Sequence, residues 1–410
     1  MPIFYFIIIM FALYLVYRKH KSILHPFIIT GTVWLLLVCV YELYATLYEQ
    51  IPHLHSSTFN CVALYLVVFY IVSEFVIRKK TTPNLKKLLQ APRILNNRIN
   101  LLFNIIFICN LYLIIRFFII TKSINIFTII STSRTLFLSG YMPMDIKLFL
   151  YIFNLTFVLL SYYYLYRPKV STSLIVAVIV EFCLVLLFIA TKGKLFKYII
   201  AVFILIYIKG LLTRKRLLYL AAISIGIVSI LTYIRDAAFF STGYYSVNDY
   251  IFIYTISPLP AFDALINGDI PFTNGSFGTR TLIFFYKILG LFINMELDYG
   301  SGAGAFTQVV GPTTTLPTNV YTALGGFYMD YGIGGIAVYA AVLSLLFSVL
   351  YRNINKRKYF FVYILTVFCL ALNFFGDFLF QFLSMTIQDI VAVLIVFSFR
   401  KVHTPIKLKL

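Results

Sequence analysis

The sequence predicts an all-α polytopic membrane protein with about eleven transmembrane helices, in a single integral membrane domain covering residues 1–410. Hydrophobic residues make up 61% of the chain and charged residues only 12%, about half the charged fraction of a typical soluble domain. The hydrophobic residues form continuous blocks, many near the roughly 20 residues that a spanning helix needs. They lack the strict alternation of barrel strands. These observations exclude soluble globular, disordered and fibrous proteins.

Hydrophobic blocks between polar breaks give the predicted spans in order. They are 2–17, 26–47, 59–77, 101–120, 146–166, 172–190, 195–212, 217–233, 319–350, 359–375 and 380–399. The first block is not expected to be a signal peptide, because its positive charges follow the block instead of preceding it. The five cysteines form no CxxC pair, so we expect neither a disulfide nor a metal role for them.

Lysine and arginine collect in alternate loops, and this orients the predicted helices. Six segments hold 24 of the 34 cations and no Asp or Glu: 18–21, 78–98, 167–169, 209–216, 352–358 and 400–409. We expect these segments in the cytoplasm, which with eleven spans places the N-terminus in the periplasm and the C-terminus in the cytoplasm. Because topology accounts for the net charge of +20, no nucleic acid partner is expected.

The longest segment on the outer face is 234–318, between the eighth and ninth predicted spans. Loops this long are unusual and tend to be functional. It is punctuated by Gly and Pro, and it contains the apolar run 282–293, which is too short to span and predicts a re-entrant or interfacial helix. The chain shows no internal repeat and no inverted pair of broken helices, which disfavours a secondary transporter.

Positive charge outside the cytoplasmic segments is the main candidate for chemistry. An anion such as a pyrophosphate would explain cations at the outer face, because the planar guanidinium fork of arginine matches phosphate oxygens. The ten remaining cations are Arg116, Lys122, Arg134, Lys147, Lys192, Lys194, Lys197, Arg235, Arg280 and Lys287.

Two places among these cations have a local pattern. Arg116 lies inside an apolar block, where an ionisable side chain predicts function, although it could also snorkel to the headgroups. Arg280 and Lys287 are nearly two helical turns apart, so we expect both on one face of the helix near 282–293. There they would line an anion pocket or contact anionic lipid headgroups.

Other cations of this set could have a structural role instead of binding an anion. Lys192, Lys194 and Lys197 could anchor a tight outer turn to headgroups, and Arg235 could pair with the adjacent Asp236.

Carboxylates and histidines complete the candidates. Ten acidic residues lie at or near the outer face, and any of them could be a general base: Glu49, Asp145, Asp236, Asp249, Asp263, Asp269, Glu296, Asp298, Asp330 and Asp377. Four others lie within spans and could pair with basic residues or stay protonated: Glu42, Glu74, Glu181 and Asp389. His53 and His55 are a weak signal for a metal or a base, and no metal site is predicted.

A motif appears where the ninth predicted span begins. Asn319-x-Tyr321-Thr322 is followed by Asp330-x-Gly332-x-x-Gly335. This stretch resembles the closing motif of the bacterial oligosaccharide repeat-unit polymerases, the Wzy-type O-antigen and capsule polymerases. The layout is similar over nearly the whole chain, with about eleven spans and one large outer loop before the last three.

The resemblance implies an inverting glycosyltransferase of the membrane-embedded GT-C type in the bacterial inner membrane. Such an enzyme transfers a glycan from undecaprenyl pyrophosphate onto a lipid-linked repeat unit at the periplasmic face, without a metal or other cofactor. The implied partners are undecaprenyl-pyrophosphate-linked oligosaccharides, the bilayer and a chain-length regulator protein.

The predicted site combines the motif with the outer cations. Asp330 and Arg280 are the predicted catalytic residues, although Asp330 could instead cap and orient the loop. The predicted substrate-binding residues are Arg116, Arg134, Lys194, Arg235, Lys287, Asn319 and Tyr321. Arg134, Arg235 and Arg280 could match outer-loop arginines of the family, whereas Lys194 stands where the family often has arginine.

Two other functions are weighed against the polymerase. A lipid-linked oligosaccharide flippase or transporter would need charges along a central cavity and has little use for a long outer loop. An O-antigen ligase shares the layout, but ligases use a histidine in the large loop, and 234–318 contains none.

Overall fold

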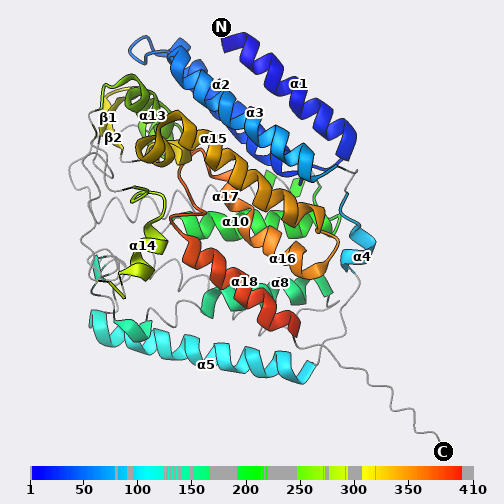
Figure 1. Ribbon diagram of the computed structural model, residues 1–410. Coiled ribbons are helices and arrows are strands. Elements are labelled where there is room, and N and C mark those ends of the chain that lie inside the picture. Colours follow the sequence, from blue (N-terminus) through cyan, green and yellow to red (C-terminus); the bar gives the residue numbers. More distant parts are fainter. Residues whose placement is uncertain are drawn as a thin grey trace, which may run out of the picture. The chain divides into compact units, whose positions relative to one another are not determined.

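The protein is described from a computed structural model (Figure 1). The structure describes residues 2–78, 82–89, 96–123, 125, 128, 132, 135–136, 141, 143–146, 152–166, 192–213, 215–216, 218–219, 247–270, 272, 277–290, 292–293, 307–318 and 320–398. The chain packs into two compact units. The first unit comprises Met1–Pro83, Tyr244–Ile354 and Thr366–Thr386, and the second comprises Asn84–Gly243, Asn355–Leu365 and Ile387–Leu410. Whether they form one membrane domain stays a prediction.

The first unit is built on four helices with a cap of smaller elements. Its long helices are α1 (Pro2–His20), α2 (Pro26–Leu47), α3 (Ser56–Val76) and α15 (Thr322–Arg352), with the short α17 (Phe368–Ala371) beside α2. Helix α2 begins where Pro26 occupies the first turn, a position at which the missing N–H costs nothing. The Nδ1 atom of His25 caps this turn by accepting the N–H of Phe27 at 3.3 Å.

The second unit consists of helices from separate parts of the chain. They are α4 (Leu85–Leu89), α5 (Asn96–Thr121), α8 (Ile152–Tyr166), α10 (Lys192–Ile208), most of α16 (Arg357–Thr366) and most of α18 (Leu383–Ser398). Helix α8 packs against both α5 and α10.

The described helices confirm an all-α membrane protein at the level of class. Four of them are long and apolar enough to cross a membrane: Pro26–Leu47, Ser56–Val76, Asn104–Thr121 and Thr322–Arg352. Predicted span 359–375 is instead two shorter helices, α16 and α17. Span 172–190 and all of 217–233 except 218–219 lie outside the described residues, so the number eleven stays a prediction.

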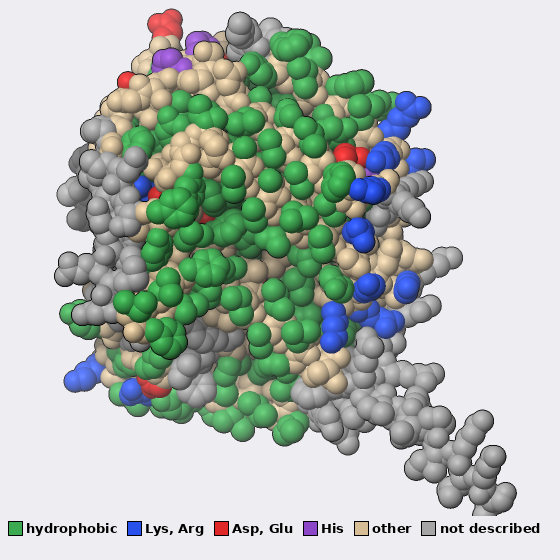
Figure 2. Space-filling view, in the orientation of Figure 1, with side chains coloured by type: hydrophobic (Ala, Val, Ile, Leu, Met, Phe, Trp, Pro, Cys, Tyr) green, Lys and Arg blue, Asp and Glu red, His purple; other side chains and the backbone are tan. Residues whose placement is uncertain are grey.

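Large hydrophobic side chains remain exposed along several helices. Phe4 of α1 is 66% exposed, and Ile108 of α5 is 65% exposed. Figure 2 shows hydrophobic side chains over much of the face in view. Soluble proteins rarely expose apolar patches this extensive, so these surfaces suit contact with lipid tails.

The C-terminal ends of α1, α3 and α15 meet at one end of the first unit. Lys19 donates to the Glu74 carboxylate at 2.5 Å, and the His20 ring nitrogen lies 3.2 Å from the same carboxylate. The His25 ring lies edge-on to Tyr351, with centroids 5.2 Å apart. Glu74 therefore pairs with basic residues, one of its two predicted alternatives. This end, the basic end of the first unit, carries Arg18, Lys19, Arg78 and Arg352.

The segment 234–318 contains regular structure where it is described. It forms α12 (Val247–Thr255), α13 (Pro258–Asn267), α14 (Ile283–Leu289) and an antiparallel hairpin of β1 (Thr307–Val310) and β2 (Thr315–Thr318), which pairs Thr307 with Thr318 and Val310 with Thr315. The hairpin was not predicted. Helix α14 lies within the predicted run 282–293 but has no buried residue, which favours an interfacial over a re-entrant helix.

Helix α13 is fastened to the N-terminal end of α3 by one carboxylate. Asp263 accepts the N–H of His55 at 3.0 Å and the hydroxyl of Thr58 at 2.6 Å, and its other oxygen lies 2.8 Å from the His55 ring nitrogen. Leu259, Phe262 and Leu265 fill the space beneath. The anchor holds the outer segment on the end of the first unit opposite its basic end.

Helix α15 is interrupted at the motif that suggested the family. Gly332 has φ 64° and ψ −153°, a conformation that is essentially restricted to glycine. A Cβ on Gly335 would lie 2.3 Å from the carbonyl oxygen of Phe327. The two motif glycines therefore allow the kink and the close backbone approach that follows it, and α15 consists of two helical parts joined at Gly332.

The kink gives a direct test by substitution. Gly332→Ala should destabilise the protein by roughly 1–3 kcal/mol, because alanine is strained at this φ and ψ. Gly334→Ala is the matched control, since Gly334 is exposed and a Cβ there would meet nothing within 4 Å. It should leave stability unchanged or raise it slightly. Thermal unfolding in detergent measures the stability of both variants. Equal midpoints would contradict the requirement for glycine at position 332.

Candidate functional site

A cavity of about 330 Å³ opens in the first unit, away from its basic end. Its wall comes from the turn before α14, the start of α15 and the chain between α17 and α18. Aromatic and aliphatic side chains form most of the wall, including Met329, Phe375, Phe378 and Phe382, and the polar side chains are Arg280, Tyr321, Thr322, Asp377 and Gln381. An apolar hollow with a few convergent polar groups is the usual form of a ligand site.

Asp330 fixes the turn that carries Arg280. One oxygen of Asp330 accepts the backbone N–H of Arg280 at 3.2 Å, the N–H of Thr281 at 3.0 Å and the Thr281 hydroxyl at 2.8 Å. The other oxygen accepts from the Arg280 guanidinium at 3.4 Å. These four contacts fix the position of the carboxylate relative to the turn. The geometry therefore favours the orienting role for Asp330.

Arg280 is a nearly buried cation on the cavity wall. Its side chain is 5% exposed and that of Asp330 is 1% exposed. A buried guanidinium requires a partner of opposite charge. Asp330 of α15 is that partner for Arg280. An anion that enters the cavity would meet a positive group already desolvated and held in place, which strengthens its attraction.

Asp377 lies on the same cavity wall, in the predicted short outer loop 376–379. Its Oδ1 accepts the N–H groups of Leu379 at 3.1 Å and Phe380 at 3.0 Å. Its Oδ2 is buried and has no hydrogen-bond partner among the described residues. Burial, opposed by the backbone donors, raises the pKa of the Asp377 carboxyl to about 7. This group can therefore exchange a proton near neutral pH.

Asp377 is a candidate functional residue that the sequence did not single out. It was one of ten acidic residues near the outer face, and only its burial and its place on the cavity wall distinguish it. The available signal was position, since Asp377 directly follows a predicted span at its outer end.

The structure places one of the two other predicted motif residues, Tyr321, and does not describe the second, Asn319. Tyr321 is 6% exposed and lines the cavity, as a sugar-binding role requires. The next helix turn is tied down where Ala323 donates its N–H to the Asn373 carbonyl at 2.9 Å. Asn319 lies outside the described residues. Arg280, Asp330 and Tyr321 are thus the predicted site residues that the structure brings together.

The expected stripe of Arg280 and Lys287 on one helix face does not form. Helix α14 begins at Ile283, so Arg280 lies in the turn before it. Arg280 is buried whereas Lys287 is exposed. The hydrogen bonds of the 280–281 backbone to Asp330 replace the helical turn that the spacing argument assumed.

The remaining predicted cations are outside the described residues or lie in the second unit. Arg134 and Arg235 are outside the described residues, and Lys194 lies in the first turn of α10. Arg116 donates to Asp145 at 2.8 Å, and Tyr112 donates to the same oxygen at 2.7 Å. Its charge is therefore already balanced within the second unit, a role that was not predicted.

Lys197 is not a headgroup anchor. It is fully buried in α10 and donates to Asp389 of α18 at 2.5 Å and to Asn154 of α8 at 3.2 Å. Asp389 therefore follows the predicted alternative of pairing with a basic residue. The pair links three helices of the second unit.

The four histidines that the structure describes contact carboxylates or a backbone N–H. His53 contacts Glu42 at 2.8 Å and His55 contacts Asp263 at the same distance, so the two do not share one site. His20, His25 and Glu74 are close enough to hold a metal ion. However, the Nδ1 of His25 accepts a backbone N–H, so the neutral ring keeps its proton on the nitrogen that faces Glu74, and no lone pair is offered there.

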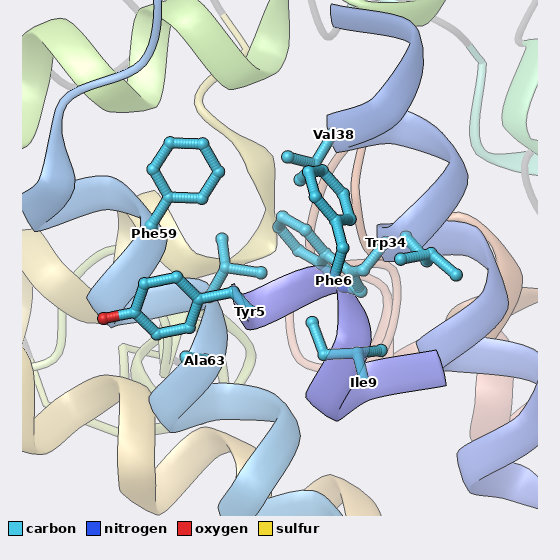
Figure 3. Close-up of a pocket in the computed structure, with 9 residues that line it drawn as sticks. Tyr5, Phe6, Ile9, Trp34, Val38, Phe59 and Ala63 are labelled. Carbon is cyan, nitrogen blue, oxygen red and sulfur yellow. The ribbon is translucent and has the colours of Figure 1, made fainter. Parts of the chain in front are cut away.

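A second hollow lies among α1, α2 and α3 (Figure 3). It measures about 10 Å³ and is lined by Tyr5, Phe6, Trp34, Val38 and Phe59, among others. This is room for a single water molecule in a hydrophobic setting. It offers no group for catalysis.

Comparison with known proteins adds no relative to this picture. No protein-family model, curated protein or solved structure matches the chain. The family suggested by the motif therefore stays a proposal, which rests on the motif and on the cavity that the motif helps to form.

The Asp377 carboxyl predicts a specific dependence of stability on pH. Because folding raises its pKa to about 7, the folded state binds the proton more tightly, and stability is lost as pH rises from about 4 to 7. Asp377→Asn should remove this loss, worth at most about 4 kcal/mol. The variant should unfold at a higher temperature than wild type at pH 8, with little difference at pH 4.5.

Asp330→Asn is the matched control for this measurement. It weakens charge-assisted hydrogen bonds worth roughly 1.5–3 kcal/mol each, so it should lower the unfolding temperature. A fall in stability for Asp377→Asn at pH 8 would contradict the assignment of a buried, strained charge.

Proposed function

We propose that the protein is a polymerase of O-antigen or a similar surface polysaccharide. It would be an inverting glycosyltransferase that moves a glycan from undecaprenyl pyrophosphate onto a lipid-linked repeat unit. The observation that carries the proposal is the cavity that combines a buried arginine, Arg280, with a protonatable carboxyl, Asp377. The motif that resembles the polymerases forms one wall of this cavity.

Topology supports the proposal. Lysine and arginine favour the cytoplasmic side of a membrane, so the basic end of the first unit would face the cytoplasm. The cavity lies toward the opposite end of α15, and would then open at the periplasmic face of a bacterial inner membrane. The lipid-linked substrates of the proposed reaction are present at that face, with their pyrophosphates at the level of the headgroups.

The chemistry of the cavity suits a pyrophosphate leaving group. When the bond between the sugar and the pyrophosphate breaks, negative charge grows on the phosphate oxygen, and a fixed arginine stabilises it without reorganisation. Asp330 holds Arg280 in position for this role. The carriers of both substrates are confined to one leaflet, which favours their encounter.

Other predicted residues keep their roles as proposals. Lys287 is exposed beside the cavity turn and would meet outer lipid phosphates. Arg116, Arg134, Lys194, Arg235 and Asn319 remain proposed substrate contacts. A chain-length regulator protein remains a proposed partner.

Substitution of Arg280 tests the proposal. In a strain lacking only this gene, a plasmid copy with Arg280→Ala should insert normally but give no polysaccharide ladder, because the leaving group loses its counter-charge. Removing one such donor typically costs 10²–10³-fold in rate. Arg280→Lys should retain part of the activity, since it keeps the charge but loses the planar fork. A gel of surface polysaccharide reads out both.

Arg352→Ala is the control, because it removes an exposed cation at the basic end. It should leave the ladder unchanged. A normal ladder from Arg280→Ala would remove Arg280 from the site. In the deletion strain itself, a single repeat unit on the lipid A core supports a polymerase, whereas loss of every repeat points to a flippase or ligase.

A further inference from the structure

Resting on the proposed polymerase function, we propose that Asp377 is the catalytic base, which takes the proton from the sugar hydroxyl that attacks. The inference assigns different roles to the two carboxylates of the site. Asp330 positions the arginine, and Asp377 handles the proton.

The two carboxylates differ in how their oxygens are used. Both oxygens of Asp330 accept from the 280–281 turn. In Asp377 the Oδ1 accepts the N–H groups of Leu379 and Phe380, which fix the orientation of the carboxyl. Its Oδ2 has no partner in the described part of the chain. An oriented carboxyl with one unused oxygen beside a cavity is the geometry that a general base requires.

Two other buried acidic residues of the first unit are committed elsewhere. Asp263 accepts from His55 and Thr58, which fastens α13 to α3. Asp249 accepts the N–H of Thr313 at 3.1 Å, which fastens the hairpin to α12. Neither residue is on the wall of the cavity. Among the residues that the structure describes, Asp377 is the acidic residue on that wall.

The reaction balances with these groups alone. The acceptor hydroxyl oxygen forms a bond to the anomeric carbon of the donor sugar as the bond from that carbon to the pyrophosphate oxygen breaks. The electron pair leaves with the pyrophosphate, whose charge is met by Arg280. The hydroxyl proton passes to the Oδ2 of Asp377. Attack opposite to the leaving group inverts the anomeric centre, as the proposed function requires.

The proton affinity of Asp377 suits this step. Burial raises the pKa of its carboxyl to about 7, and a base works best when its pKa is close to the working pH. The titratable groups near it are Arg280 and Tyr321, which line the same cavity, and Tyr339, whose charge interacts with that of Asp377. Arginine and tyrosine ordinarily titrate far above neutral pH, so a rate change near pH 7 would report Asp377.

The test uses the full-length protein in lipid nanodiscs with purified lipid-linked repeat units. Asp377→Asn should lower the rate of elongation by about 10²–10⁴-fold with little change in the KM for the lipid-linked substrate. Asparagine keeps the Oδ1 acceptor for Leu379 and Phe380, so the loop should stay folded. The wild-type rate should rise with pH through about 7, and the residual rate of the variant should not.

Asp269→Asn is the matched control, since Asp269 is an exposed carboxylate of the outer segment. It should keep both the wild-type rate and the pH profile. If Asp377→Asn elongates at the wild-type rate, or if its rate still rises near pH 7, Asp377 is not the base. The proposed polymerase function would be unaffected by that result. Absence of elongation by the wild-type protein overturns the polymerase itself. A raised KM with an unchanged kcat would make Asp377 a binding residue and also overturns the base.

Discussion

The contact between Asp330 and the 280–281 turn is the interaction on which the rest of the site depends. It joins residues fifty positions apart, one in a long helix and the other in the outer segment. Without this carboxylate, Arg280 would be a buried cation without its ion-pair partner, which is unfavourable enough to move the turn. The same contact holds Arg280 on the cavity wall, so the position of that charge depends on Asp330.

The second unit follows the same rule of paired charge. Lys197 is neutralised by Asp389, and Arg116 by Asp145. In an apolar environment an ionised group is tolerated when a partner stands beside it. Several carboxylates of this acid-poor chain are therefore used to balance cations. Asp377 differs, because its Oδ1 accepts from backbone N–H groups and no cation of the described residues lies at hydrogen-bond distance.

The sequence allowed several of the described helices to be predicted, because the hydrophobic length of a span is a local property, whereas predicted span 359–375 is two short helices. The bounds of α2 and α3 differ from prediction by three residues at most. The site was predicted in part. Asp330 and Tyr321 belong to a recognisable motif, but their contact with Arg280 depends on tertiary structure. The predicted stripe of Arg280 and Lys287 failed because spacing reveals shared faces only within a continuous helix. Asp377 was hidden among ten acidic residues until burial distinguished it.

The kink at Gly332 also sets a depth. The part of α15 after it runs to Arg352, about 20 residues or about 30 Å of helix, which equals the thickness of a bilayer's hydrocarbon core. In the proposed orientation, the part before the kink, with Asp330 and Tyr321, would lie in the headgroup layer. The part of α15 after the kink would then set the height of the cavity residues relative to the headgroup phosphates. A bilayer of different thickness would change that height without altering a contact within the helix.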